Sequence, residues 1–114
     1  MILRICIVIP SFNNSRTIST VVKDIVKSTP FPVLVVDDGS ETAVENVLYS
    51  FEVRQALEER RVRVVRFKNH RGKGAALQFA MRELIAEGFT HMMTMDGDGQ
   101  QPASEINKLV DIAK

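Results

Sequence analysis

The chain has little of several features that would place it in a specialised class of protein. It contains one cysteine, Cys6, so no internal disulfide can form, which excludes a disulfide-stapled secreted domain and favours a reducing compartment. No apolar run approaches the roughly 20 residues that a membrane-spanning helix needs. The opening residues, Met1–Arg4, have neither the charged start nor the small-residue cleavage site of a signal peptide. We therefore expect a soluble, cytoplasmic protein.

The chain also has no large excess of positive or negative charge. Fifteen Lys and Arg residues against fourteen Asp and Glu residues give a formal net charge of +1, which argues against a protein that binds nucleic acid mainly through charge. The content of 45% hydrophobic and 25% charged residues is that of an ordinary globular domain. Because 114 residues suffice for one hydrophobic core and not for two, we predict a single domain over residues 1–114.

Four short apolar runs predict four buried strands. The runs are rich in β-branched residues and lack the alternation of a strand that is exposed on one face, which is typical of a parallel sheet. They are Ile2–Ile9, Val33–Val36, Val62–Phe67 and Met92–Met95. The fourth run is rich in methionine, which has weak strand propensity, so its position along the chain rather than its composition favours a strand.

Between these runs, apolar residues recur at the spacing of three and four that is typical of a helix. The first helix is predicted to begin at a cap formed by Asn14 or Ser15 and to end before Pro30. The second is predicted to begin at a capping box in Thr42–Glu45 and to break near Glu52–Ala56, where the apolar pattern loses its phase.

Two further helices complete the pattern. The third, whose apolar stripe runs from Leu77 to Ile85, is predicted to end at Gly88, and the fourth is predicted from Pro102 to Ala113. Strict alternation of strand and helix predicts an α/β fold, in which helices cover both faces of a parallel sheet of about four strands. In such sheets ligands bind at the carboxyl ends of the strands, so the residues that follow each strand are the candidates for function.

Two aspartates follow the fourth predicted strand. Alternate residues of an extended segment point to the same side, so Asp96 and Asp98 can face one cation, and Gln100 offers an amide oxygen nearby. Hard oxygen donors of this kind suit Mg²⁺ or Mn²⁺ that also holds phosphate oxygens. The alternative is a solvated turn, because Asp-Gly dipeptides are common turn formers.

A second acidic pair, Asp37 and Asp38, follows the second predicted strand. Carboxylates next to a buried run require partners, and ribose hydroxyls, a base N–H or a Lys or Arg side chain would each serve. The alternative is that one of the two caps the helix predicted at Thr42 or the turn before it.

The loop after the third predicted strand is basic and rich in glycine. In Arg71–Gly74 two cations and two glycines stand at the start of the third predicted helix, where backbone N–H groups favour an anion. The segment lacks the third glycine of a dinucleotide-binding fingerprint and the spacing of a Walker loop. The alternative is a loop that is basic only for solubility. His70 in this loop could contact a phosphate, but a lone loop histidine more often has no direct function, and we expect His91 at the start of the fourth strand to be structural.

The four strand-end segments together resemble family 2 glycosyltransferases, and most closely the branch of dolichyl- and polyprenyl-phosphate mannose or glucose synthases. The resemblance is carried by Ile7–Asn14, Val35–Ser40, Asn69–Ala76 and Met95–Gln100, which occur in the family's order and cover essentially the whole chain. It implies a Rossmann-like GT-A domain that binds a nucleotide sugar, with strand order 3-2-1-4.

The resemblance also implies roles for individual residues. Pro10, Phe12 and Asn14 would line the nucleoside pocket, Asp38 with Asp37 would bind the base, and Lys73 would lie near base or phosphate. The DxD-type site of the family would consist of Asp96, which also contacts the nucleotide sugar, Asp98 and Gln100. It would hold Mg²⁺ or Mn²⁺ against the diphosphate of a UDP- or GDP-sugar. The sugar would pass with inversion to an acceptor such as a polyprenyl phosphate or a glycan.

The sequence departs from the family pattern in two places. Phe12–Asn14 lacks the hydroxyl and the carboxylate that are common there, and no residue up to Lys114 matches the family's catalytic base. We therefore expect a truncated domain whose base lies beyond Lys114, with a catalytically incomplete nucleotide- and metal-binding module as the alternative. The full-length protein would lie at the inner face of a membrane. In the implied strand order Met92–Met95 is an uncovered edge, which predicts self-association.

Overall fold

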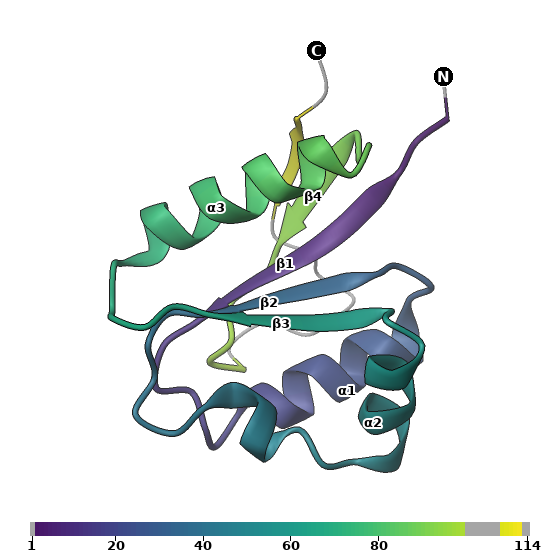
Figure 1. The fold of residues 1–114 in the computed structure, drawn as a ribbon. Helices are drawn as coiled ribbons and strands as arrows, with labels where there is room; N and C mark the ends of the chain where they lie inside the picture. The colour runs from purple at the N-terminus through teal and green to yellow at the C-terminus, as the bar shows by residue number, and fades with distance from the viewer. Residues whose placement is uncertain (1, 100–107, 113–114) are drawn as a thin grey trace.

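A twisted five-stranded sheet forms the centre of the structure, a computed structural model that describes residues 2–99 and 108–112 (Figure 1). The strands lie in the order β3-β2-β1-β4-β5. Four are parallel: β1 (Ile5–Ser11), β2 (Val33–Asp37), β3 (Val62–Arg66) and β4 (His91–Thr94). The predicted parallel sheet with order 3-2-1-4 is confirmed. A fifth strand, β5 (Lys108–Asp111), adds to it antiparallel to β4.

Helices cover both faces of the sheet, as predicted. On one face lie α1 (Ile18–Ser28), the short 3-10 helix η1 (Val44–Val47) and α2 (Phe51–Glu58), and on the other lies α3 (Lys73–Ala86). Each face of the sheet has its own hydrophobic core, and alternate residues of β1 point into one core or the other. Ile7 and Ile9 pack with α1 and α2, whereas Cys6 and Val8 pack with α3. Because both faces of β1 are buried, its sequence is almost continuously apolar.

The first two helices begin at different residues from those predicted. Helix α1 begins at Ile18 with Thr17 as its N-cap, and no side chain caps it. Asn14 does not cap the helix through its side chain, because Asn14 Oδ1 accepts hydrogen bonds from Ser11 Oγ and Phe12 N. The chain before α1 is therefore a tight turn held by Asn14.

The predicted capping box in Thr42–Glu45 is also wrong. The amide of Val44 donates to the carboxylate of Asp37 at 2.9 Å, and only a 3-10 helix follows. Helix α2 begins after Ser50, whose hydroxyl accepts from Val53 N, so the expected break at Glu52–Ala56 lies inside a helix. Helix α3 ends as predicted, with Gly88 in the left-handed region at φ +87°.

The last predicted helix is wrong where the structure describes it, because Lys108–Asp111 is strand β5; its predicted start at Pro102 lies outside the described residues. Pairing with β4 satisfies hydrogen-bonding groups that would otherwise form an open edge, and Ile112 packs into the core on the α3 face. The expected self-association through Met92–Met95 is therefore wrong in its premise, since β5 already occupies that edge. In the described part of the chain no helix has the length and apolar character needed to cross a membrane.

Candidate functional site

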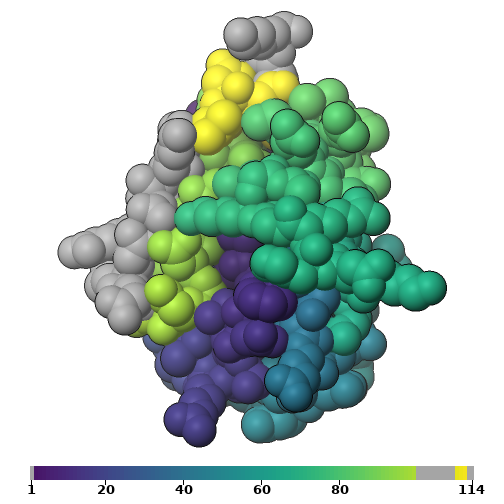
Figure 2. All heavy atoms as spheres, turned by 90° about the vertical axis from the view of Figure 1, so that its left-hand side faces the viewer, coloured from purple at the N-terminus to yellow at the C-terminus, as the bar shows by residue number. Residues whose placement is uncertain are grey.

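A pocket of about 260 Å³ opens where the carboxyl ends of β1, β2 and β4 meet the start of α3. Figure 2 looks onto this side of the molecule, where the segments after β1 (purple) and β4 (yellow-green) lie side by side next to α3 (green). The pocket is lined by Pro10, Ser11, Phe12, Asn14, Asp38, His70, Lys73, Asp96, Gly97 and Asp98.

Seven of the nine residues predicted as ligand contacts line this pocket. They are Pro10, Phe12, Asn14, Asp38, Lys73, Asp96 and Asp98. Asp37 does not line it, and Gln100 lies outside the described residues. Their convergence follows from the topology, because parallel strands bring the segments after them to one edge of the sheet.

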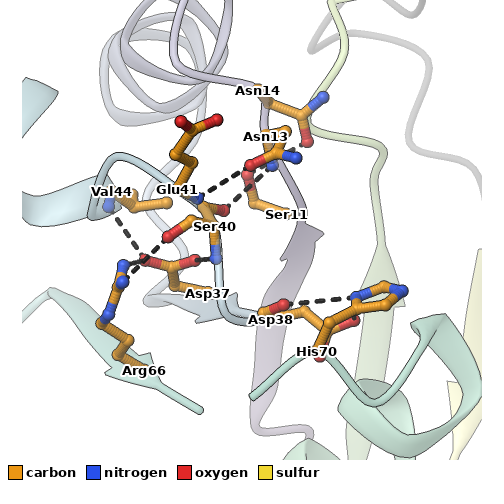
Figure 3. A network of polar contacts seen from close by, with 10 residues as sticks. All are labelled: Ser11, Asn13, Asn14, Asp37, Asp38, Ser40, Glu41, Val44, Arg66 and His70. Atoms are coloured by element: carbon orange, nitrogen blue, oxygen red, sulfur yellow. Dashed lines mark hydrogen bonds and ion pairs between the residues drawn. The ribbon is translucent and has the colours of Figure 1, made fainter. Parts of the chain in front are cut away.

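The segment after β1 forms a turn that is fixed to the loop after β2. Asn13 adopts a left-handed conformation at φ +53°, its amide donates to Ser40 Oγ at 3.0 Å, and its side-chain oxygen accepts from Glu41 N at 2.8 Å. Figure 3 shows these contacts joining the two loops. This brace holds Phe12, which is 42% exposed, at the mouth of the pocket.

Asp37 points away from the pocket and is fully buried. Its Oδ1 accepts from Ser40 N at 3.0 Å, and its Oδ2 accepts from Val44 N at 2.9 Å and pairs with the Arg66 guanidinium at 2.8 Å (Figure 3). Burial raises the pKa of Asp37, but the hydrogen bonds from Ser40, Val44 and Arg66 outweigh it, so that the pKa lies below its usual value. This is the capping arrangement that the sequence left open as the alternative for this residue pair.

The carboxylate of Asp38 binds the start of α3. Its Oδ1 accepts from Arg71 N at 2.7 Å and its Oδ2 accepts from Gly72 N at 2.8 Å, while His70 Nδ1 lies 2.8 Å from Oδ2. The residue is 2% exposed. Backbone amides next to a helix start favour an anion, and at Arg71 and Gly72 that anion is the protein's own carboxylate rather than a phosphate.

His70 is a wall of the pocket, which the sequence did not predict. Its ring stacks on Phe12 with centroids 3.8 Å apart and planes inclined by 27°. Its side chain is 51% exposed although the ring is held by both Phe12 and Asp38. A lone loop histidine carries no pattern that reveals such contacts, because both partners lie on other strands' loops, more than 30 positions away for Asp38.

The acidic side of the pocket is packed tightly against the turn after β1. Thr17 Oγ1 donates to Gly97 O at 2.7 Å, and a Cβ placed at Gly97 would lie 3.0 Å from Asn14 Oδ1. Glycine at position 97 therefore lets the segment approach the turn and places Asp96 and Asp98 in the pocket. Across the pocket, Lys73 Nζ pairs with Asp96 Oδ1 at 3.0 Å.

The donor set fits a divalent cation only if a ligand supplies further oxygens. Among residues 2–99 and 108–112 no three His, Cys, Asp or Glu side chains come together in a group that could hold a metal ion. Asp96 and Asp98 offer two carboxylates in one pocket. Mg²⁺ and similar hard cations are commonly held by one or two carboxylates together with substrate phosphates and water, so these residues fit a cation bound jointly with a phosphate ligand.

Comparison with known proteins gives one consistent result. Residues 6–114 match the family described as Glycosyl transferase family 2. The chain is 26% identical over 92% of its length to dolichyl-phosphate beta-glucosyltransferase of Saccharomyces cerevisiae. It is 30% identical over 94% of its length to glycosyltransferase AglJ of Haloferax volcanii. It spans 33% and 31% of the lengths of these two relatives.

Solved structures agree with this match. The mannosyltransferase PcManGT of Pyrobaculum calidifontis, solved with GDP-Man and Mn²⁺, superposes with a TM-score of 0.68 at 21% identity, covering 83% of this chain and 27% of that one. Glucosyl-3-phosphoglycerate synthase of Mycobacterium tuberculosis, solved with UDP, gives a TM-score of 0.57 at 26% identity, covering 82% and 33%. These similarities place the fold among GT-A glycosyltransferases.

Proposed function

Because this chain belongs to glycosyl transferase family 2, we propose that it binds a nucleoside-diphosphate sugar and a divalent cation in the pocket beside β1, β2 and β4. One observation carries the proposal: an aromatic ring, an ammonium group and two carboxylates come from three distant segments into one pocket. These groups match the three parts of such a ligand, since a base stacks on a ring, phosphates attract a cation, and carboxylates hold a metal.

The proposed ligand lies along the pocket with its nucleoside next to β1 and its phosphates next to α3. Pro10, Phe12 and Asn14, with Asp38 behind them, form the nucleoside end. Lys73 and Asp96 form the phosphate end, where they pair at 3.0 Å. Asp37 takes no part in this proposal, because its carboxylate is used entirely inside the protein.

The proposed cation, Mg²⁺ or Mn²⁺, is held by Asp96 and Asp98, with Gln100 as a further oxygen donor. When bound, it neutralises charge on the departing nucleoside diphosphate. If Asp96 held the cation, the ammonium group of Lys73, which pairs with that carboxylate, would be available to a phosphate oxygen. In the ligand-free protein, the Lys73–Asp96 pair therefore keeps both charges partnered.

The reaction we propose is transfer of the sugar, with inversion, from UDP or GDP to an acceptor oxygen. The chain spans about a third of its curated relatives, and we assign the acceptor site and the catalytic base to sequence beyond Lys114. A polyprenyl phosphate is the proposed acceptor, because the yeast relative is a dolichyl-phosphate glucosyltransferase. Such an acceptor would place the full-length protein at the inner face of a membrane.

Calorimetric titration of the chain with UDP and GDP, each with and without Mn²⁺, tests the donor site. We expect binding of at least one nucleotide that is strengthened by Mn²⁺, because two carboxylates alone are a weak cation site. Failure of both nucleotides to bind a folded sample would contradict the proposal. Binding by a chain extended beyond Lys114 that transfers and hydrolyses no sugar would favour the alternative, a nucleotide-binding module without transferase activity.

A further inference from the structure

We infer that Thr17, at the start of α1, is a positioning residue for the proposed cation site. Its side chain holds the turn that carries Asp96 and Asp98, and so keeps both carboxylates in the pocket. Thr17 itself does not line the pocket. The inference rests on the proposed function and deepens it, because it names a residue that acts on the cation through two others.

The acidic segment lies beyond the pairing of β4 with the rest of the sheet. That pairing ends with Thr94 opposite Val8, after which Met95 N donates to Val8 O at 3.0 Å. Asp96 and Asp98 follow, and residues 97 and 98 form a turn. Because a cation requires both carboxylates in defined positions, contacts outside the sheet have to hold this turn.

The hydroxyl of Thr17 is committed to this turn rather than to its own helix. Thr17 Oγ1 donates to Gly97 O at 2.7 Å. Asn14 O lies farther from the hydroxyl, at 3.4 Å, and already accepts from the amides of Thr17 and Ile18. A hydroxyl has one hydrogen to donate, so the shorter contact, with Gly97 O, takes it. Although Thr17 is the N-cap of α1, its side chain makes no capping bond.

Thr17 contacts the chain on both sides of Asp98. Its hydroxyl binds the carbonyl of Gly97, and a Cβ placed at Gly99 would lie 3.6 Å from Thr17 Cβ. The carbonyl of Gly97 and the amide of Asp98 belong to one planar peptide unit. A bond to that carbonyl therefore restrains the rotation that would carry the Asp98 carboxylate out of the pocket.

Thr17 is itself fixed within α1 and the turn that precedes it. Its amide donates to Asn14 O at 3.0 Å, and its carbonyl accepts from Val21 N at 3.1 Å. Asn14 Oδ1 in turn accepts from Phe12 N, so this turn also forms the nucleoside end of the pocket. A donor held in this way orders the acidic segment before a ligand binds.

The test measures binding of UDP and GDP with and without Mn²⁺ to the wild-type chain and to Thr17→Val, which keeps a branched side chain of similar size and loses the hydroxyl. We expect the factor by which Mn²⁺ increases nucleotide affinity to fall about tenfold in Thr17→Val, as is typical when a group that orients a metal ligand is removed. Affinity without Mn²⁺ should not change. Thr17→Ser, which retains the donor, should keep most of the wild-type factor, and Thr17→Ala should lose it as Thr17→Val does.

The same helix offers a matched control at its other end. Thr29 directly follows α1, and its Oγ1 donates to Ile25 O at 3.0 Å. Thr29→Val therefore also removes a bond from a threonine hydroxyl to a backbone carbonyl, but away from the pocket. We expect both valine variants to lower the midpoint of urea unfolding modestly, and only Thr17→Val to reduce the effect of Mn²⁺.

The outcomes separate this inference from the proposed function. Wild-type protein that binds neither nucleotide, or binds one with no effect of Mn²⁺, contradicts the proposed function, and the inference with it. An effect of Mn²⁺ in Thr17→Val equal to that in the wild type overturns the role of Thr17 and leaves the proposed site standing. Equal losses with and without Mn²⁺, or the same loss in Thr17→Ser, also overturn it, because Thr17 would then support the pocket through packing and not through its hydroxyl.

Discussion

At the scale of single residues, Asp37 and Asp38 are neighbours in the sequence but contact different parts of the molecule. Successive side chains at the end of a strand point to opposite sides, so one carboxylate turns toward η1 and β3 and the other toward the start of α3 (Figure 3). Asp37 organises the loop that follows β2, and Asp38 organises the loop that follows β3. Asp38 lines the pocket and Asp37 does not, but both carboxylates hold loops that form its walls.

Replacing Asp37 by Asn should lower the free energy of unfolding by about 1–3 kcal/mol at pH 7, because a buried carboxylate with three partners loses its charge and an acceptor. The pKa of Asp37 is below its ordinary value of 3.8 in the folded protein, so this stabilisation is complete above that pH and is lost as the pH falls through the lower, folded value. Urea unfolding of both proteins between pH 7 and pH 2 checks the sign. A difference that stays constant on acidification would contradict it.

Asp98→Ala should remove the Mn²⁺-dependent part of nucleotide binding, at least about tenfold, in a chain that remains folded. The reason is that Asp98 is one of only two carboxylates assigned to the cation. Titration with the nucleotide that the wild type binds, with and without Mn²⁺, measures the loss. Asp24→Ala, which removes an exposed carboxylate from α1, is the control. Equal Mn²⁺ enhancement in Asp98→Ala and wild type would refute the assignment.

Lys73→Met should weaken binding of UDP or GDP about five- to tenfold and leave binding of the free nucleoside nearly unchanged, since an ammonium group acts on phosphate charge. Lys27→Met, at the exposed end of α1, provides the comparison for a general loss of positive charge. Equal losses for nucleotide and nucleoside would show that Lys73 contacts the base or ribose instead.

The sequence predicts which residues line the pocket better than it predicts the hydrogen bonds between them. Phe12, Asp38 and Asp96 could be assigned to one site because each follows a strand of a parallel sheet. The bonds between Asp38 and the amides of Arg71 and Gly72 cross 33 and 34 positions of chain, and no local pattern encodes them. The position of His70 in the wall of the pocket depends on these bonds, so the sequence did not predict it.

At the scale of elements, the predicted helices and strands were correct where the burial of apolar residues alone determines the structure. They were wrong where competing hydrogen bonds determine it. The runs that became β1 and β2 are almost entirely buried and that of β3 is half-buried, and their apolar sequence was sufficient. Around β5 the apolar residues Val110 and Ile112 alternate as in a strand, while Leu109 and Val110 also fit a helical stripe. The open edge of β4 decides between them, and that edge is known only once the sheet is assembled.

The loop after β2 packs so closely on the loop after β3 that it tolerates no side chain at Gly39. A Cβ there would lie 2.7 Å from His70 N, and φ is +72°. Gly72 also has a positive φ, +100°, but a Cβ there would meet no atom within 4 Å. Gly74 lies in α3, and a Cβ there would likewise meet nothing within 4 Å. These three positions separate the effects of contact, backbone strain and helix propensity.

Alanine at each position should give a graded series in the free energy of unfolding. We expect Gly74→Ala to stabilise by up to about 1 kcal/mol through helix propensity. Gly72→Ala should cost about 1–2 kcal/mol from backbone strain, and Gly39→Ala clearly more, because backbone atoms must also move. Denaturant unfolding measures all three. Equal costs at positions 39 and 72 would mean that the two loops are not in contact.

At the scale of the whole molecule, the centre of the sheet is closed to solvent on both faces. Cys6 lies in β1, is 0% exposed, and burial raises the pKa of its thiol to about 12, so the thiolate is scarce at pH 8.

A thiol reagent should therefore modify the native chain at least about a thousandfold more slowly than the chain in guanidinium chloride, because reaction requires opening of the core. The absorbance of the chromophore that the reagent releases measures the rate of modification of the native and of the unfolded chain at pH 8. Rapid, stoichiometric modification of the folded protein would mean that β1 is not the stable centre.

The position of β4 beside β1 has a consequence for the order in which the molecule assembles. Arg4 and Thr90, which hydrogen-bond where the two strands begin, are 86 positions apart, whereas β1 pairs with β2 across a single helix. Closing so long a loop costs entropy that is recovered only when β4 docks. The nucleoside side of the pocket can form with the first half of the sheet, but its acidic side arrives with β4. During synthesis, the residues that form the acidic side therefore emerge after those that form the nucleoside side.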